Sequence, residues 1–257
     1  MNVAAESHSP LEQFKIKCLA LCGEGGELQA YSFTNSSLFM VLAVIGATLL
    51  MVYGMRQRSL VPGRLQSVAE LSYEFVANMV RENVGTNGRQ YFPFIFTLFM
   101  FILFSNMLGM VPYSFTVTSH IIVTFALAIV VFLGVTLIAI ARNGIHFFTH
   151  FMPAGVPLWL APVIIPIEII SYLSRPISLS LRLAANMLAG HTTLKVFAGF
   201  VVSMIGMGGV LSASGILPLI MVTALTALEF LIAFLQAYVF SILTCLYLSE
   251  AVNMEHH

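Results

Sequence analysis

Ionisable side chains stand inside two long, otherwise apolar segments near the C-terminus. They are Glu168, Arg175, Arg182, His191, Lys195 and Glu229, with the amides Asn186 and Gln236 beside them. A charge held in membrane hydrocarbon costs at least ~2.5–3.5 kcal/mol on insertion scales, so such residues usually mark an ion path. Carboxylates and imidazole exchange protons, whereas a guanidinium keeps its proton at every relevant pH. These residue types predict proton transfer around a fixed positive charge.

Structural roles are the alternative for each of these charges. Arg175 and Lys195 lie near segment ends, from which long side chains reach the membrane interface. Arg182 and Glu229 lie too centrally for that, and their alternative role is an internal salt bridge. Asn106, in an earlier apolar segment, either borders a polar channel or bonds to a neighbouring helix.

Helical spacing divides these residues between faces. The members of one face, within about 80° of one another, are Glu168, Arg175, Arg182 and Asn186. His191 follows Arg182 by nine residues and falls on the opposite face, while Glu229 and Gln236 are seven apart and share a face. The pattern indicates two half-paths separated by a positive charge, not a continuous proton wire.

The composition is that of a membrane protein. The 257 residues are 59% hydrophobic and 9% charged, against about 25% charged in soluble domains. Mean hydropathy is +0.95. The formal net charge of zero gives no indication of a nucleic-acid partner.

Neither a metal nor a cofactor is predicted. Cys18, Cys22 and Cys245 have no metal-binding spacing and are odd in number, and we expect the first two to be a chance pair. His146 and His150 are four residues apart but lack a third ligand nearby. No phosphate-binding loop motif is present, so nucleotide chemistry is expected elsewhere.

The hydropathy pattern predicts a single all-α polytopic membrane domain over 1–257. A polar N-terminal segment, 1–36, precedes a span at 37–55 and an amphipathic helix at 60–84 whose Arg64 and Arg81 suit a membrane surface. A helical hairpin follows at 91–141, with spans at 91–111 and 118–141 around a short turn at 112–115. Trp159 is expected to anchor at the membrane interface.

The last two helical segments, 162–208 and 215–252, are too long for upright spans. They would measure about 70 Å and 57 Å as helices, whereas crossing a bilayer takes about 20 residues. Either each segment is broken, which Pro166, Pro176 and Pro218 allow, or both are strongly tilted. We predict two long tilted helices that form the ion path.

Basic residues set the topology. Arginines cluster at 56–89, Arg142 follows the third span, and the turns at 112–119 and 207–216 contain no Lys or Arg. The positive-inside rule therefore places 56–90, 142–160 and the C-terminus inside and the N-terminus outside. Five crossings plus one surface helix satisfy both lengths and charges.

The run from Leu179 to His191, LSLRLAANMLAGH, resembles the signature of the a subunit of F-type ATP synthases, in the alphaproteobacterial and mitochondrial branch. Weaker supporting segments are 9–14, 106–109, 166–168 and 229–236. Small residues in the same helix allow close approach of another helix. They are Ser171, Ser174, Ser178, Ala184, Ala185, Ala189 and Gly190.

The resemblance implies that Arg182 faces a rotor ring (the c-ring) and contacts its carboxylates, with Asn186 and Gln236 bordering that contact. Glu168 would line the inner half-channel, and His191 and Glu229 the outer one. Many bacterial members exchange the acid and the histidine of this last pair. The implied partners are the c-ring, b-type peripheral-stalk subunits, lipids and protons.

The function expected from this resemblance is proton translocation by a stator subunit that couples proton flow to ring rotation and ATP synthesis, without catalysis of its own. A secondary ion transporter is the alternative, disfavoured because no internal repeat is present. We expect a bacterial inner membrane, with the mitochondrial inner membrane as the alternative.

Overall fold

The computed structural model describes residues 14, 16, 18–20, 32–56, 59, 61–111, 114–144, 160–206 and 215–252. The long helices are α1 (Asn35–Arg56), α2 (Arg64–Val84), α3 (Phe92–Gly109), α4 (Ile121–Asn143), α5 (Ala161–Gly206) and α7 (Ile216–Val252). Short 3-10 helices occur at η3 (Thr86–Tyr91) and η4 (Val117–Ser119). Predictions for Pro112, His146, His150 and Trp159 lie outside the described residues.

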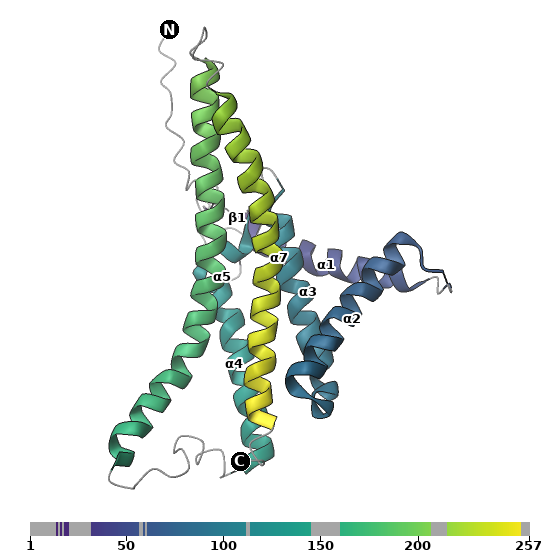
Figure 1. Cartoon of the computed structure of the whole chain (residues 1–257), viewed down its shortest axis with the longest axis vertical. Coiled ribbons are helices and arrows are strands. Elements are labelled where there is room, and N and C mark those ends of the chain that lie inside the picture. Colours follow the sequence, from purple (N-terminus) through teal and green to yellow (C-terminus); the bar gives the residue numbers. More distant parts are fainter. Residues whose placement is uncertain are drawn as a thin grey trace.

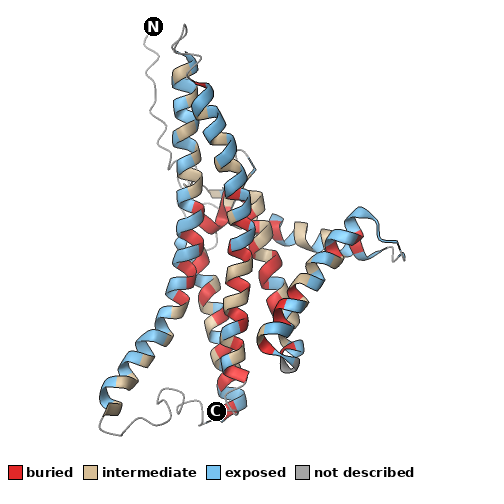
Figure 2. Cartoon of the chain, in the orientation of Figure 1, coloured by how far each residue is buried: buried red, intermediate tan, exposed pale blue. Residues whose placement is uncertain are grey.

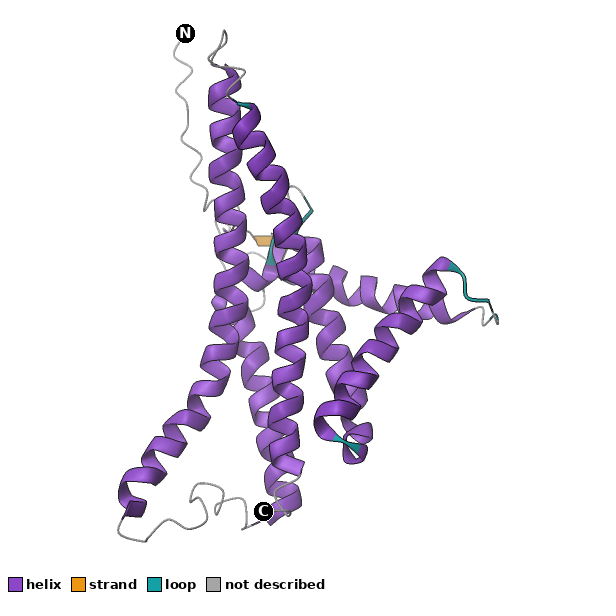
Figure 3. Cartoon of the chain, in the orientation of Figure 1, coloured by secondary structure: helices purple, strands orange, loops and turns teal. Residues whose placement is uncertain are grey.

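The all-helical prediction is confirmed. All of the long helices except α2 have the length and apolar character needed to cross a membrane, five in the described part of the chain. Figure 3 shows helix throughout, apart from a small antiparallel pair of strands, β1 (Cys18–Ala20) and β2 (Phe33–Thr34). The sequence analysis did not predict this pair of strands.

Helix α5 is continuous over 46 residues, about 69 Å at the usual rise. Pro166 and Pro176 stand inside it without ending it, so the alternative of two separate spans is wrong for this segment. Figure 1 shows its N-terminal part diverging from α7, and proline is a known cause of such bends. Helix α7 is also unbroken, with 37 residues, and runs antiparallel to α5.

Helices α1 and α5 point in very different directions. In Figure 1, α5 and α7 follow the long axis of the molecule, whereas α1 runs across it. The 22 residues of α1 match the thickness of a bilayer when the helix stands upright. The strong tilt of α5 and α7 against the membrane stays a prediction, which this difference in direction supports.

The core lies where α3, α4, α5 and α7 meet. Figure 2 shows buried residues gathered in this central region, while the upper parts of α5 and α7 are mostly exposed. The largest fully buried side chains include Phe99, Ile102, Leu183 and Phe240. Because many exposed side chains are also large and apolar, the chain presents far more hydrophobic surface than water tolerates.

Helix α2 has two apolar faces. Val76, Met79 and Val80 are buried against the rest of the chain, whereas Leu65 and Leu71 are 60% and 69% exposed. The predicted single apolar stripe therefore divides into a side packed on protein and a side left for other contacts. Placement of this helix at a membrane surface stays a prediction.

Two further details depart from the sequence predictions. The polar residues 116–120 precede α4, which begins at Ile121 and not at 118, and Thr116, Thr118 and Ser119 are buried. They fold into the bundle because α3, α4 and α5 all pack around η4. Cys18 is disulfide-bonded, so its interpretation as part of a chance pair is wrong, while Cys245 is free and buried.

Candidate functional site

Arg182 lies near the middle of α5 and is exposed at the surface of the chain. Its neighbours Leu179, Leu183 and Met187 are buried and fix the inward face of the helix. The guanidinium has no ion-pair partner among the residues that the structure describes. The alternative of an internal salt bridge is therefore not borne out, and a bare positive charge faces out of the chain.

The surface around Arg182 is built from small side chains. Ser174, Ser178, Ala185 and Ala189 are exposed, as is Ser171 near the N-terminal end of the same stretch. Ala184 is the exception, since only 5% of it is exposed. Small side chains let a second helix approach the backbone closely.

Asn186 stands one helical turn beyond Arg182 and connects α5 to α7. Its Nδ2 donates to Oε1 of Gln236 at 2.9 Å. Gln236 is 4% exposed, and its Nε2 has no hydrogen-bond partner within the described part of the chain. The Gln236 amide therefore keeps one buried donor without a partner among the described residues.

His191 and Glu229 face each other across α5 and α7. Nε2 of His191 lies 3.6 Å from Oε1 of Glu229, and the same nitrogen lies 3.0 Å from Oγ1 of Thr116. Glu229 is 4% exposed, and neither carboxylate oxygen has a hydrogen-bond partner in the described residues. A buried acid therefore stands beside a half-buried base.

Gly190 makes room for this carboxylate. A Cβ added at Gly190 would stand 2.6 Å from Oε1 and 3.0 Å from Cδ of Glu229. Any larger residue must displace the acid from its position beside His191. The glycine belongs to the signature run, and this close approach gives a physical reason for it.

A polar wall continues from this pair toward α3. Nδ2 of Asn106 donates to the carbonyl of Ala233 at 3.0 Å, and Oδ1 accepts from Thr118 at 2.8 Å. Asn106 therefore bonds to a neighbouring helix, as one of its two alternatives predicted. Sequence reasoning missed Thr116 and Thr118, although the polar run 116–120 before an apolar span was a visible signal.

Glu168 lies apart from the other predicted residues. It is half-buried on α5 and precedes Arg182 by 14 residues, about 21 Å along a helix. His191 lies about 14 Å beyond Arg182 in the other direction. The helix therefore separates the two sets of titratable groups and holds Arg182 between them.

Arg175 is held by contacts across α5 and α7. Its Nη1 donates to the carboxylate of Glu250, and its guanidinium carbon lies 5.3 Å and 5.0 Å from the ring centroids of Tyr172 and Tyr247. Such cation–π contacts stabilise a side chain that would otherwise be mobile. Arg175 thus has a structural partner, while Lys195 is exposed.

No cluster of three metal-ligating side chains occurs within the described ranges. One further titratable group, His120, stands just before α4 and stacks on Phe115 with centroids 5.0 Å apart. Burial lowers the pKa of His120 below its usual 6.5, partly offset by a backbone hydrogen bond with Phe14. His120 therefore favours its neutral form.

The comparisons with known proteins agree with one another. The family described as ATP synthase A chain matches residues 36–249. The chain belongs to the ATP synthase a-subunit family. Among its relatives, subunit a of Parvibaculum lavamentivorans is 60% identical over 96% of this chain and 94% of its own. Subunit a of Mesorhizobium japonicum is 55% identical over 99% of this chain and 100% of its own. Subunit a of Rhodospirillum rubrum is 57% identical over 96% of this chain and 99% of its own.

Membership of the a-subunit family fixes the general role. The chain is the proton-translocating membrane subunit of the Fo part of ATP synthase and is not itself catalytic. It is a multi-pass protein of a bacterial inner membrane. Membership also makes it a component of the Fo complex.

Proposed function

We propose that this a subunit provides two proton half-paths to a rotor ring, kept apart by Arg182. The observation that carries the proposal is the position of Arg182, which is exposed and unpaired among the described residues between a buried acid–base pair and Glu168. A charge placed so in an apolar helix needs a partner of opposite sign from outside the chain. A ring carboxylate has the required charge.

On the outer side, a proton passes His191 and Glu229 and neutralises a ring carboxylate. The 3.6 Å separation of His191 and Glu229 allows transfer either directly after a small movement or through one water. The neutral ring site can then turn into lipid, where an isolated charged carboxylate would be heavily penalised. Asn186 and Gln236 border the contact and offer amide groups to the carboxylate.

On the inner side, the ring carboxylate releases its proton toward Glu168 after nearly a full turn. Arg182 then stabilises the deprotonated carboxylate, and its guanidinium cannot relay a proton between the two sides. Protons therefore cross only by rotating the ring. The membrane potential supplies about 2.3 kcal/mol per charge per 100 mV for this motion.

The partners follow from the exposed surfaces. The small-residue face of α5 around Arg182 suits a ring of closely packed helices. The apolar surface of α1, which includes Val44, Val52 and Tyr53 at 51–58% exposed, is available to lipid and to b-type stalk helices. No nucleic acid, metal or cofactor enters the proposal.

The experiment is proton pumping in inverted membrane vesicles that contain the complete synthase with Arg182→Ala, Arg182→Lys or the unchanged chain. We expect loss of ATP-driven pumping in Arg182→Ala with the complex still assembled. Arg182→Lys keeps the charge but not the planar, bidentate geometry, so it should recover pumping only in part. Normal pumping by Arg182→Ala would refute the proposal.

A further inference from the structure

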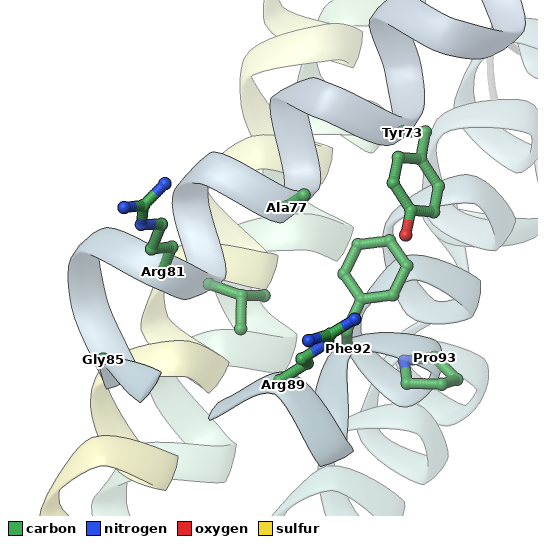
Figure 4. A pocket seen from close by; sticks show the side chains of 8 residues that line it. Tyr73, Ala77, Arg81, Gly85, Arg89, Phe92 and Pro93 are labelled. Atoms are coloured by element: carbon green, nitrogen blue, oxygen red, sulfur yellow. The ribbon is translucent and has the colours of Figure 1, made fainter. Parts of the chain in front are cut away.

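A groove separates the C-terminal half of α2 from the start of α3. Its volume is about 610 Å³, and it is lined by Tyr73, Ala77, Val80, Arg81, Gly85, Arg89, Phe92 and Pro93. Figure 4 shows that Arg81 comes from α2 while Arg89 and Phe92 come from the segment that follows the turn. Gly85 forms this turn at a φ of 79°, a conformation that favours glycine.

The charge of the groove is entirely positive. Two of its lining residues are arginines and none is acidic. Arg81 and Arg89 are exposed, and neither guanidinium has an ion-pair partner among the residues described. In Figure 4 the Arg89 guanidinium lies beside Phe92, whereas that of Arg81 points away from it. Arg89 can donate to a phosphate group in the groove, and Arg81 adds a second positive charge at its edge.

The rest of the groove is apolar and stiff. The rings of Tyr73 and Phe92 are 4.7 Å apart at their centroids, and Phe92 stacks on Phe96 at 5.5 Å. Ala77, Val80 and Pro93 complete the apolar wall. The occupant must therefore combine an anionic group with a hydrocarbon part, which free phosphate lacks.

We propose that this groove binds one anionic phospholipid of the inner leaflet, with its phosphate at Arg89, near the positive charge of Arg81, and its acyl chains along Tyr73 and Phe92. The position agrees with this ligand, because the arginines at 56–89 mark the inner side and α3 enters the apolar core at this point. The exposed Leu71 and Val68 continue the apolar surface away from the groove.

The test uses the complete synthase, stripped of loosely held lipid in detergent and then titrated with phosphatidylglycerol or phosphatidylcholine. Bound lipid is counted by native mass spectrometry. We expect one phosphatidylglycerol site that the double variant Arg81→Gln, Arg89→Gln weakens by about tenfold or more, because the charge-assisted contact at Arg89 and the positive charge of Arg81 are both lost. Arg64→Gln is the matched control, since Arg64 is exposed on the same helix but outside the groove, and it should leave the site unchanged.

Three outcomes would overturn the proposal. Equal phosphatidylglycerol binding by the double variant would place the lipid elsewhere. Displacement of the lipid by inorganic phosphate at matching concentration would identify a simple anion site without an acyl-chain contribution. Loss of a stalk subunit from the double variant, with lipid binding intact, would identify an acidic protein segment as the occupant. ATP-driven pumping measured in parallel reports on the half-paths separately.

Discussion

Nε2 of His191 lies 3.6 Å from Oε1 of Glu229, and the two residues come from the antiparallel helices α5 and α7. A base, His191, and an acid, Glu229, therefore lie next to each other between α5 and α7. Proton transfer between them depends on their separation, whichever of the two helices carries the acid.

Replacing Glu229 by Gln should reduce proton-driven ATP synthesis by at least about tenfold, since a positioned proton-transfer group typically contributes about 10² or more. The amide has the same shape but cannot exchange a proton. The double exchange His191→Glu, Glu229→His should recover activity relative to Glu229→Gln. Synthesis rates in vesicles, normalised to assembled complex, provide the measurement, and an unaffected Glu229→Gln would remove Glu229 from the path.

Gly190→Ala should impair proton flux without preventing assembly. Its Cβ would approach Oε1 of Glu229 to 2.6 Å and force the carboxylate away from His191. Gly199→Ala is the matched control on the same helix, because a Cβ there meets nothing within 4 Å. Passive proton flux and ATP synthesis should fall for the first variant and hold for the second. Equal rates in both would show that the carboxylate moves freely.

Thr116→Val should lower proton flux by a smaller factor, about two- to tenfold if one neutral hydrogen bond of about 0.5–1.5 kcal/mol is lost. The hydroxyl lies 3.0 Å from Nε2 of His191 and 3.4 Å from the carbonyl of Gly109, to which it donates. The direction of the hydrogen bond to Nε2 depends on the tautomer of His191, and in either direction the hydroxyl orients the ring. Thr116→Ser should restore the flux and its pH profile, whereas a purely packing role predicts that Ser is the worse substitute.

Acid should destabilise the protein through His120. Its folded-state pKa is lowered by burial, so the unfolded chain binds the proton more readily. Stability is then complete above the unfolded value of about 6.5 and is lost as the pH falls from there toward the folded pKa. His120→Gln should flatten this part of the profile of melting temperature against pH for the purified synthase. Parallel profiles for both proteins would contradict the prediction.

The helices were predictable because their apolar runs are long and have clear ends. The predicted span at 37–55 is observed as Asn35–Arg56, and the segment 162–208 as Ala161–Gly206. The continuity of α5 was harder to predict, because prolines inside a helix allow either a bend or a break. In the folded chain α5 packs against both α4 and α7, and we attribute its continuity to these contacts.

From residue spacing, the site was predictable only where the residues share a helix, and the pairing of His191 with Glu229 across two helices came from the family resemblance. The common face of Arg182 and Asn186 follows from their spacing. The contact of Arg175 with Glu250 joins residues 75 apart in sequence, and that of Thr116 with His191 depends on a loop folding inward. Periodicity contains no information on such contacts between distant segments.

One continuous helix carries Glu168, Arg182 and His191. The helix therefore fixes the spacing of these three residues, because the 23 residues from Glu168 to His191 span about 35 Å along a helix. Inserting a single residue between them would turn everything beyond it by about 100° and move it by about 1.5 Å. A substitution changes the chemistry at one position and leaves the spacing intact. An insertion or deletion between Glu168 and His191 would instead rotate one of them relative to the face that Arg182 presents to the ring.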